Sequence, residues 1–205
     1  MSPALAADIA RFRADSAERL ARLRPTDTLK GLFVRRYLEL FRELGGAPLE
    51  RRGRDALQER RIFDFLNYPY AGVVQMGLAV VDELAPRYGG VDAWLDEMGR
   101  LATTSYLGSL LGRAFLAGFQ PSPRAMLTGM PWAISTTFSF GERSVTFSHP
   151  SSCLFHCRRE FSAAPSNAGA VRAAIEAVGA QDVRVGIKLL DLFNYDLEVS
   201  WREKS

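Results

Sequence analysis

With 205 residues the chain is long enough for one well-packed domain, and 47% apolar and 24% charged residues are typical of a soluble globular protein. The formal charge of +3 is low for a nucleic-acid binder, and no apolar run approaches the roughly 18 residues needed to span a bilayer. Two cysteines close together do not suggest a secreted disulfide framework, and charged residues interrupt the N-terminal stretch where a signal peptide would be continuous. We expect a cytoplasmic protein with reduced thiols.

The part of the chain before Ile134 has apolar residues at helical spacing. Proline and glycine divide it, because Pro25, the pair Gly45-Gly46 and the pair Gly89-Gly90 each interrupt a helical pattern. Another helix is framed at its start by Pro121 and Pro123, and Pro131 is expected to end it. The other predicted helices cover residues 4–23, 27–44, 49–61, 70–84 and 91–115.

The apolar period changes from helical to alternating at Ile134. Gly141-Glu142 is expected to form a turn between the first two extended runs, and one helix interrupts the series later. The predicted strands are Ile134–Phe140, Val145–Phe147, Cys153–Phe161, Val183–Leu189 and Tyr195–Trp201, with the helix at Ser166–Gly179.

This order of elements predicts an α+β fold in a single domain that covers residues 1–205. A helical part (1–133) would pack on one face of a four- to five-stranded antiparallel sheet (134–201). The helix at 166–179 would cross over between the third and fourth strands, in a βββαββ order.

Residue types that bind metal ions crowd together only at Cys153, His156, Cys157 and Glu160. In a strand, however, Cys153 and Cys157 share one face while His156 points to the other. The three-residue gap between the cysteines also departs from the usual zinc knuckle. We therefore interpret the cysteines as small buried apolar residues and expect no metal.

Motifs of the common enzyme classes are absent from the sequence. It contains no G-x-S-x-G, no P-loop and no G-x-G-x-x-G. His149 and His156 lie on or beside predicted strands, where a histidine is more often structural than catalytic. Enzyme activity is therefore the less favoured class, and no catalytic residue is predicted.

Aromatic and apolar residues of the middle helices form a candidate ligand pocket. Most aromatic residues are simply core, but tyrosine and tryptophan also carry polar groups that orient a small ligand in an apolar pocket. If these side chains converge, they would line a pocket at the junction of helices and sheet. The candidates are Phe65, Tyr68, Tyr70, Val74, Met76, Tyr106, Leu110 and Trp132.

Several phrases, spread over most of the chain from Asp27 onward, resemble a known family. Their order and spacing are similar to those of the large paralogous family of uncharacterised proteins that is expanded in myxobacteria, domain-of-unknown-function family 2378. The phrases are Asp27–Phe33, Phe63–Pro69, Gly99-Arg100, Tyr106–Ser109, Gly112-Arg113, Phe140–Arg143 and Tyr195–Trp201.

The resemblance implies mainly a fold, because the family is distantly similar to the heme-nitric-oxide-binding domains and to the vinyl-reductase-type sensor domains. Both place helices over an antiparallel sheet and hold a small molecule or lipid. The heme-binding domains need a histidine on a helix and a Y-x-S-x-R triad. This chain has no histidine in its helical part, since the first one is His149, and it contains no Y-x-S-x-R triad. The zinc site of the other group is matched only loosely by Cys153, Cys157 and Glu160. No cofactor is therefore expected.

These observations favour a non-enzymatic regulatory or sensor-like domain that binds a small apolar ligand or a protein partner. An accessory enzyme of specialised metabolism that uses the same cavity is the alternative, and a structural interaction module is the third possibility. We expect neither nucleic-acid binding nor a membrane span, and a homodimer is left open.

Overall fold

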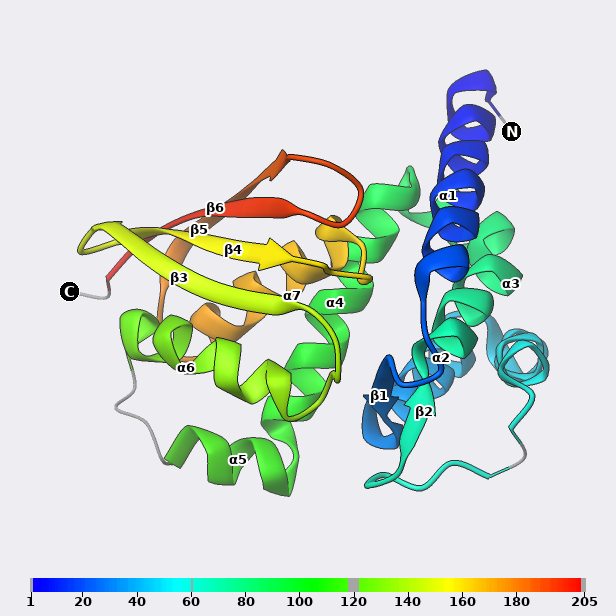
Figure 1. The fold of residues 1–205 in the computed structure, drawn as a ribbon, viewed down its shortest axis with the longest axis horizontal. Helices are drawn as coiled ribbons and strands as arrows, with labels where there is room; N and C mark the ends of the chain where they lie inside the picture. Colours follow the sequence, from blue (N-terminus) through cyan, green and yellow to red (C-terminus); the bar gives the residue numbers. More distant parts are fainter. Residues whose placement is uncertain (1, 60, 118–121, 204–205) are drawn as a thin grey trace. The chain divides into compact units, whose positions relative to one another are not determined.

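The computed structural model describes residues 2–59, 61–117 and 122–203. The chain forms two compact units, Met1–Met98 and Gly99–Ser205 (Figure 1). Helix α4 (Val91–Gly108) runs through the boundary between them. None of the helices in the described residues has the length and apolar character that crossing a membrane requires. The expectation of one domain over residues 1–205 stays a prediction.

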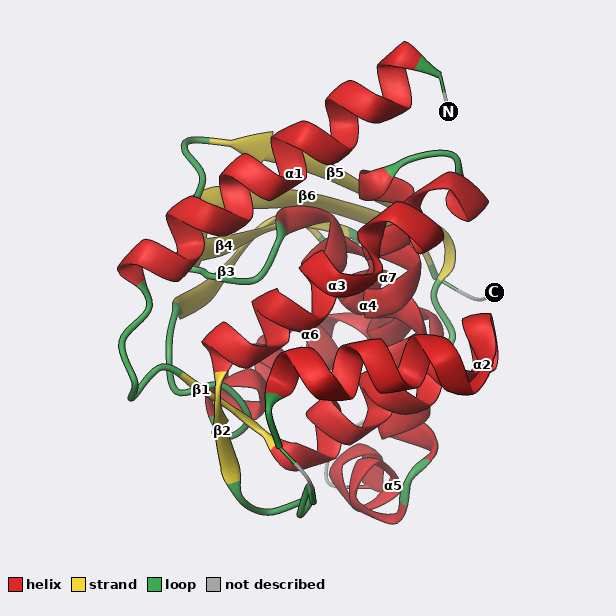
Figure 2. Cartoon of the chain, turned by 90° about the vertical axis from the view of Figure 1, so that its right-hand side faces the viewer, coloured by secondary structure: helices red, strands yellow, loops and turns green. Residues whose placement is uncertain are grey.

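The first unit contains α1 (Pro3–Arg22), α2 (Gly31–Leu57), α3 (Tyr70–Tyr88) and the start of α4. It also contains two short antiparallel strands, β1 (Thr28–Lys30) and β2 (Asn67–Pro69), drawn in yellow in Figure 2. The predicted helix 27–44 is therefore wrong at Thr28–Lys30, whereas Asn67–Pro69 lies between the predicted helices 49–61 and 70–84. Each strand has only three residues and is followed directly by a helix. Such a short extended stretch leaves no alternating pattern that could be recognised in the sequence.

Helix α2 includes both of the helices predicted between residues 27 and 61. Gly46 separates them, because its φ of 74° and ψ of −172° break the helical path. The second half ends at Leu57 rather than at Arg61. There Gln58 adopts the left-handed conformation, and its backbone N–H donates to the carbonyls of Arg54 and Asp55.

The second unit holds the sheet. Its strands are β3 (Glu142–His149), β4 (Ser152–Arg158), β5 (Gln181–Leu189) and β6 (Tyr195–Arg202), in the order β3-β4-β6-β5 with every pair antiparallel. Helices α5 (Leu110–Ala117) and α6 (Pro123–Ser135) precede the sheet, and α7 (Ala164–Glu176) connects β4 to β5. The predicted α+β class, with helices first and an antiparallel sheet last, is confirmed.

The predicted strand Ile134–Phe140 is wrong, and the last third of the chain reads ββαββ. Helix α6 continues through Pro131 to Ser135. A proline removes only one backbone hydrogen bond, and hydroxyl groups satisfy the last carbonyls of this helix. Ser135 Oγ donates to Trp132 O and Thr136 Oγ1 to Ala133 O, both at 2.7 Å.

One face of the sheet carries the core of the second unit. Alternate residues of β4 and β6, such as Phe155, Tyr195 and Leu197, are buried against α6 and α7. Each large side chain buried in this way contributes about 1.5–3 kcal/mol. The opposite face carries mainly polar side chains. The sheet therefore has an inner apolar face and an outer polar face.

Candidate functional site

Three of the predicted pocket residues belong to the interior of the first unit. Tyr68, Tyr70 and Met76 are 5%, 8% and 1% exposed. The hydroxyl of Tyr68 accepts from the backbone N–H of Phe63 at 2.8 Å, so its polar group is satisfied within the unit. By contrast, Phe65 is 74% exposed in the loop before β2. Burial of this kind fits both a solid core and the wall of a pocket.

The remaining candidates are Val74 on α3 and three residues of the second unit. Val74 and Tyr106 are half-buried, and burial raises the pKa of the Tyr106 phenol. Trp132 on α6 is 65% exposed. The side chain of Leu110 lies outside the described residues. A pocket shared by these residues therefore stays a prediction.

The two cysteines lie on the inner face of β4 and His156 on the outer face, as the alternation predicts. Burial raises the pKa of Cys153 to about 11 and, together with the charge of Glu160, that of Cys157 to about 12. Both buried thiols therefore hold their protons more tightly than a free cysteine does, and zinc binding would require them to lose those protons. Among the described residues no three His, Cys, Asp or Glu side chains are grouped as metal ligands.

Glu160 forms a buried ion pair with Arg143, which the sequence did not reveal. The two side chains are 0% and 3% exposed. Glu160 Oε1 also accepts from the backbone N–H of Ser162 at 2.9 Å, and Arg143 Nη1 donates to Phe140 O at 3.0 Å. Burial raises the pKa of Glu160, and the Arg143 charge opposes that shift.

Tyr195 extends this buried polar group toward α7. Its hydroxyl donates to Ser162 O at 3.4 Å and accepts from the Asn167 side chain. Burial, reinforced by the charges of Glu160 and Cys157, holds the pKa of Tyr195 well above its usual value. We call Arg143, Cys157, Glu160, Ser162, Asn167 and Tyr195 the inner polar cluster.

Four phenylalanines stack edge to face next to the inner polar cluster. Phe138, Phe140, Phe161 and Phe193 follow one another with ring centroids 5.4, 5.4 and 5.5 Å apart. The guanidinium carbon of Arg143 lies 5.5 Å from the Phe138 ring centroid. Phe138 and Phe140, predicted to be in a strand, thus have a packing role instead.

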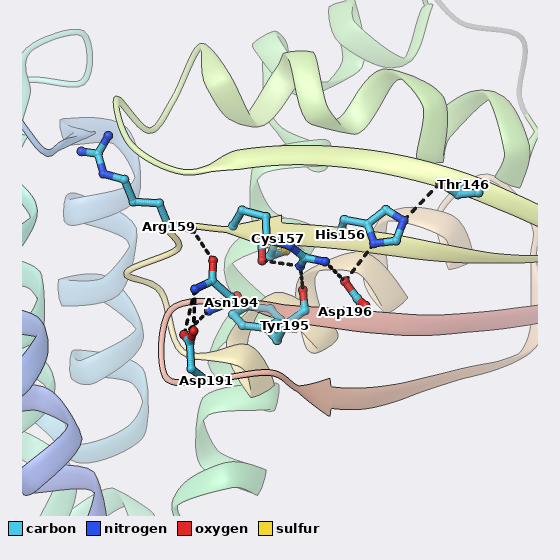
Figure 3. Close-up of polar contacts among 9 residues, drawn as sticks. Thr146, His156, Cys157, Arg159, Asp191, Asn194, Tyr195 and Asp196 are labelled. Carbon is cyan, nitrogen blue, oxygen red and sulfur yellow. Dashed lines mark hydrogen bonds and ion pairs between the residues drawn. The ribbon is translucent and has the colours of Figure 1, made fainter.

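On the outer face a row of polar side chains crosses three strands (Figure 3). His156 Nε2 lies 3.1 Å from Thr146 Oγ1, and His156 Nδ1 lies 2.8 Å from Asp196 Oδ1. Arg158 donates to the same Asp196 oxygen at 2.7 Å. Burial alone would raise the pKa of Asp196, but the hydrogen bonds and charges of His156 and Arg158 outweigh it and lower that pKa.

A second polar contact in Figure 3 closes the turn between β5 and β6. Asp191 Oδ1 accepts from the backbone N–H group of Asn194 at 2.9 Å. It also accepts from the backbone N–H group of Phe193 at 2.7 Å. Asn194 Oδ1 then accepts from the Arg159 backbone N–H at 3.1 Å. This arrangement holds the end of β4 against the turn.

A hydroxyl, an imidazole and a carboxylate in one hydrogen-bonded row have the connectivity of nucleophilic hydrolases. Here Arg158 shares the carboxylate, and Thr146 stands exposed on a sheet face. We interpret the row as a cross-strand network that fixes the register of β3, β4 and β6.

Sequence reasoning missed Arg143, Asp196 and Thr146 as members of these networks. Two of them stand inside phrases quoted for the family resemblance, Phe140–Arg143 and Tyr195–Trp201, but no local pattern marks them as partners. His156 and Asp196 are 40 positions apart and meet only because β4 pairs with β6.

A family profile described as "Protein of unknown function (DUF2378)" matches residues 22–202. No curated protein matches the chain.

Solved structures with a similar fold are H-NOX proteins. The Fe(II) unliganded H-NOX protein from K. algicida aligns with a TM-score of 0.68 at 12% identity, over 86% of this chain and 98% of that one. An H-NOX protein from S. oneidensis in the Fe(II) ligation state gives 0.70 at 9% identity, over 86% and 98%. The S. oneidensis protein in the Fe(II)NO ligation state gives 0.66 at 8% identity, over 85% and 100%. These values show the same fold.

The histidines of this chain do not fit a heme held by a helical histidine. The chain contains two, and neither lies on a helix: His149 ends β3 and His156 lies within β4. Both ring nitrogens of His156 are already bonded to Asp196 and Thr146. The fold is shared, and neither histidine of this chain lies on a helix from which it could hold iron.

Proposed function

We propose that this chain, which belongs to the DUF2378 family, is a non-enzymatic regulatory domain that binds a small apolar ligand. The ligand would shift the balance between conformations of the domain, and a protein partner would respond to that shift.

One observation carries this proposal: the chain keeps the complete H-NOX fold, covering 98% of the compared chains, while its histidines lie on strands. A protein with this fold has been solved in an Fe(II)NO ligation state. A scaffold kept at about 10% identity without a helical histidine is suited to a ligand held by packing rather than by iron.

Tyr106 and Trp132 are our candidates for ligand contacts in the second unit. Both present a large ring with one polar group, and neither is fully buried. Such side chains give apolar contact area and one hydrogen bond to orient a ligand.

Native mass spectrometry of freshly purified protein tests the proposal directly. We expect a co-purified small molecule that adds a fixed mass to the chain and dissociates on activation. Tyr106→Ala should reduce the fraction of loaded protein, whereas Tyr106→Phe should keep most of it. Two negative results together would contradict ligand binding. The purified chain would carry no added mass, and no apolar extract from the source cells would change its melting temperature.

Thermal unfolding of variants separates a pocket from a solid core. If Tyr106 lines a pocket, Tyr106→Ala should be tolerated because space for the missing ring already exists. Leu127→Ala is the control, since Leu127 is 0% exposed and its truncation should cost about 2–5 kcal/mol. An equally large loss for Tyr106→Ala would exclude a pocket at that position.

A further inference from the structure

Strand β5 forms one edge of the sheet and pairs only with β6 among the described residues. It is nine residues long, and none of the nine is fully buried. An edge of this length presents a row of backbone N–H and C=O groups to which another extended chain can add.

The two faces of β5 differ in chemistry. On the inner face Val183 and Val185 pack against the core of the second unit, but Ile187 and Leu189 are 40% and 65% exposed. Leu190, just beyond the strand, is 53% exposed. The inner side of the edge therefore ends in an apolar surface that α7 leaves uncovered.

The outer face of β5 carries Arg184 and Lys188, both exposed. No ion pair within the described part of the chain involves either residue. Gly186 lies between them, opposite Glu198 on β6. The edge thus carries apolar side chains on one face. On the other face it carries two cations that form no ion pair within the described residues, although Lys188 lies opposite Asp196 on β6.

We propose that the β5 edge is a docking site for an extended segment of a partner protein in which apolar and acidic residues alternate. Backbone hydrogen bonds to β5 supply part of the affinity. Apolar residues of the segment cover Ile187 and Leu189, and its carboxylates face Arg184 and Lys188. This surface is independent of the proposed ligand, and either proposal can fail without the other.

Charge argues against a second copy of the chain as the occupant. Two β5 strands paired about Gly186 would place Arg184 of one directly opposite Lys188 of the other. Like charges at opposite positions destabilise a strand pair. The same cations that attract an acidic segment therefore oppose self-pairing.

Glu198 adds one requirement for the partner. It lies opposite Gly186, and its carboxylate oxygen is 3.5 Å from where a Cβ of residue 186 would stand. A carboxylate of the partner segment placed beside Gly186 would be repelled by the negative charge of Glu198. The partner residue at that position should be uncharged, with acidic residues two positions away on either side.

The experiment measures binding of fluorescent peptides to the full-length protein by anisotropy. The probe has glutamate opposite Arg184 and Lys188, threonine opposite Gly186, and valine opposite Val185, Ile187 and Leu189. A second peptide replaces both glutamates by lysine, and a third keeps them but is N-methylated at alternate residues, which removes backbone donors. We expect only the first to bind, and more weakly as salt concentration rises.

The protein variant Arg184→Glu, Lys188→Glu should bind the glutamate peptide at least roughly ten-fold more weakly and should now prefer the lysine peptide. The control variant, Ser144→Glu, Ser148→Glu, adds two acids to exposed positions on the outer face of β3, the opposite edge. It should bind as the parent chain does. Circular dichroism of each variant verifies the fold.

Equal binding of glutamate and lysine peptides, or no binding of either to a folded protein, would overturn the proposal. Arg184 and Lys188 would then only protect the edge from aggregation. A concentration-dependent dimer that the Leu189→Lys variant abolishes would also overturn it, since the edge would then serve a second copy.

Discussion

Arg143 and Glu160 form an ion pair in the second unit whose side chains are only 3% and 0% exposed. Removing a charge from water costs several kcal/mol, and the attraction between the partners repays this only with further hydrogen bonds. The backbone groups of Ser162 and Phe140 provide those bonds. Removing one partner should therefore be costly, because the other charge would stay buried without its counter-charge.

Arg143→Met should destabilise the protein by about 3–5 kcal/mol in urea unfolding, because it leaves the Glu160 carboxyl buried without its partner. Arg202→Met is the matched control. Arg202 pairs with Asp182 at 2.9 Å, but both side chains are 66% exposed, and its loss should cost less than about 1 kcal/mol. Similar losses for both variants would contradict the importance of the buried pair.

Cys157 should make stability fall at alkaline pH. Its pKa is raised from an ordinary 9.0 to about 12, so the unfolded chain releases the thiol proton first. The stability that the buried thiol contributes is complete below pH 9 and is lost as pH rises toward 12, by about 1.4 kcal/mol per pH unit.

Urea unfolding between pH 8 and about 11 checks this, with Cys157→Ala as the comparison that removes only this titration. The difference in stability between the parent chain and the variant should shrink steadily above pH 9. A difference that stays constant with pH would show that the thiol is not held neutral by the fold.

At the scale of elements, one glycine permits the close approach of α4 and α7. A Cβ at Gly99 would stand 1.9 Å from the backbone oxygen of Ser166, well inside contact distance. Since the obstacle is backbone, it cannot move aside as a flexible side chain could. Helix packing in this unit therefore requires glycine at this position.

Gly99→Ala should lower the melting temperature by many degrees, through strain of the kind seen in overpacked cores, on the order of 1–3 kcal/mol or more. Gly108→Ala, at the end of the same helix, has no atom within 4 Å of the new Cβ and should be neutral or stabilising by roughly 0.5 kcal/mol. Equal effects of the two changes would mean that helix propensity, not contact with α7, decides the result.

For the whole molecule, α4 passes from one compact unit into the other, so we expect the two units to unfold together. Hydrogen exchange measured by mass spectrometry should give the same opening free energy for slowly exchanging amides of α3 and of β6. Two clearly separated values would instead mean that the units are independent domains.

The positions of the histidines and cysteines lead to a prediction about cofactors. The protein as purified should show no Soret absorbance and should contain less than one zinc per chain. Cys153 and Cys157 are held as thiols, and neither histidine lies on a helix. One zinc per chain that is lost on Cys153→Ser would overturn this expectation.

The sequence alone determined the features that depend on neighbours along the chain. Its period predicted the α+β class and four of the five strands, its glycines marked the break at Gly46, and its alternation separated Cys153 and Cys157 from His156. These follow from local rules, because side-chain direction repeats every 3.6 residues in helices and every second residue in strands.

Tertiary structure alone decided which distant residues meet. Strand order brought His156 to Asp196, and the packing of the second unit brought Arg143 to Glu160. It also decided that residues 134–140 form the end of a helix and a turn. Alternating apolar residues over seven positions can face the core of a sheet, but they can equally pack as stacked aromatic rings, as Phe138 and Phe140 do. Strand order and register depend on contacts between residues far apart in the chain, and no local period records them.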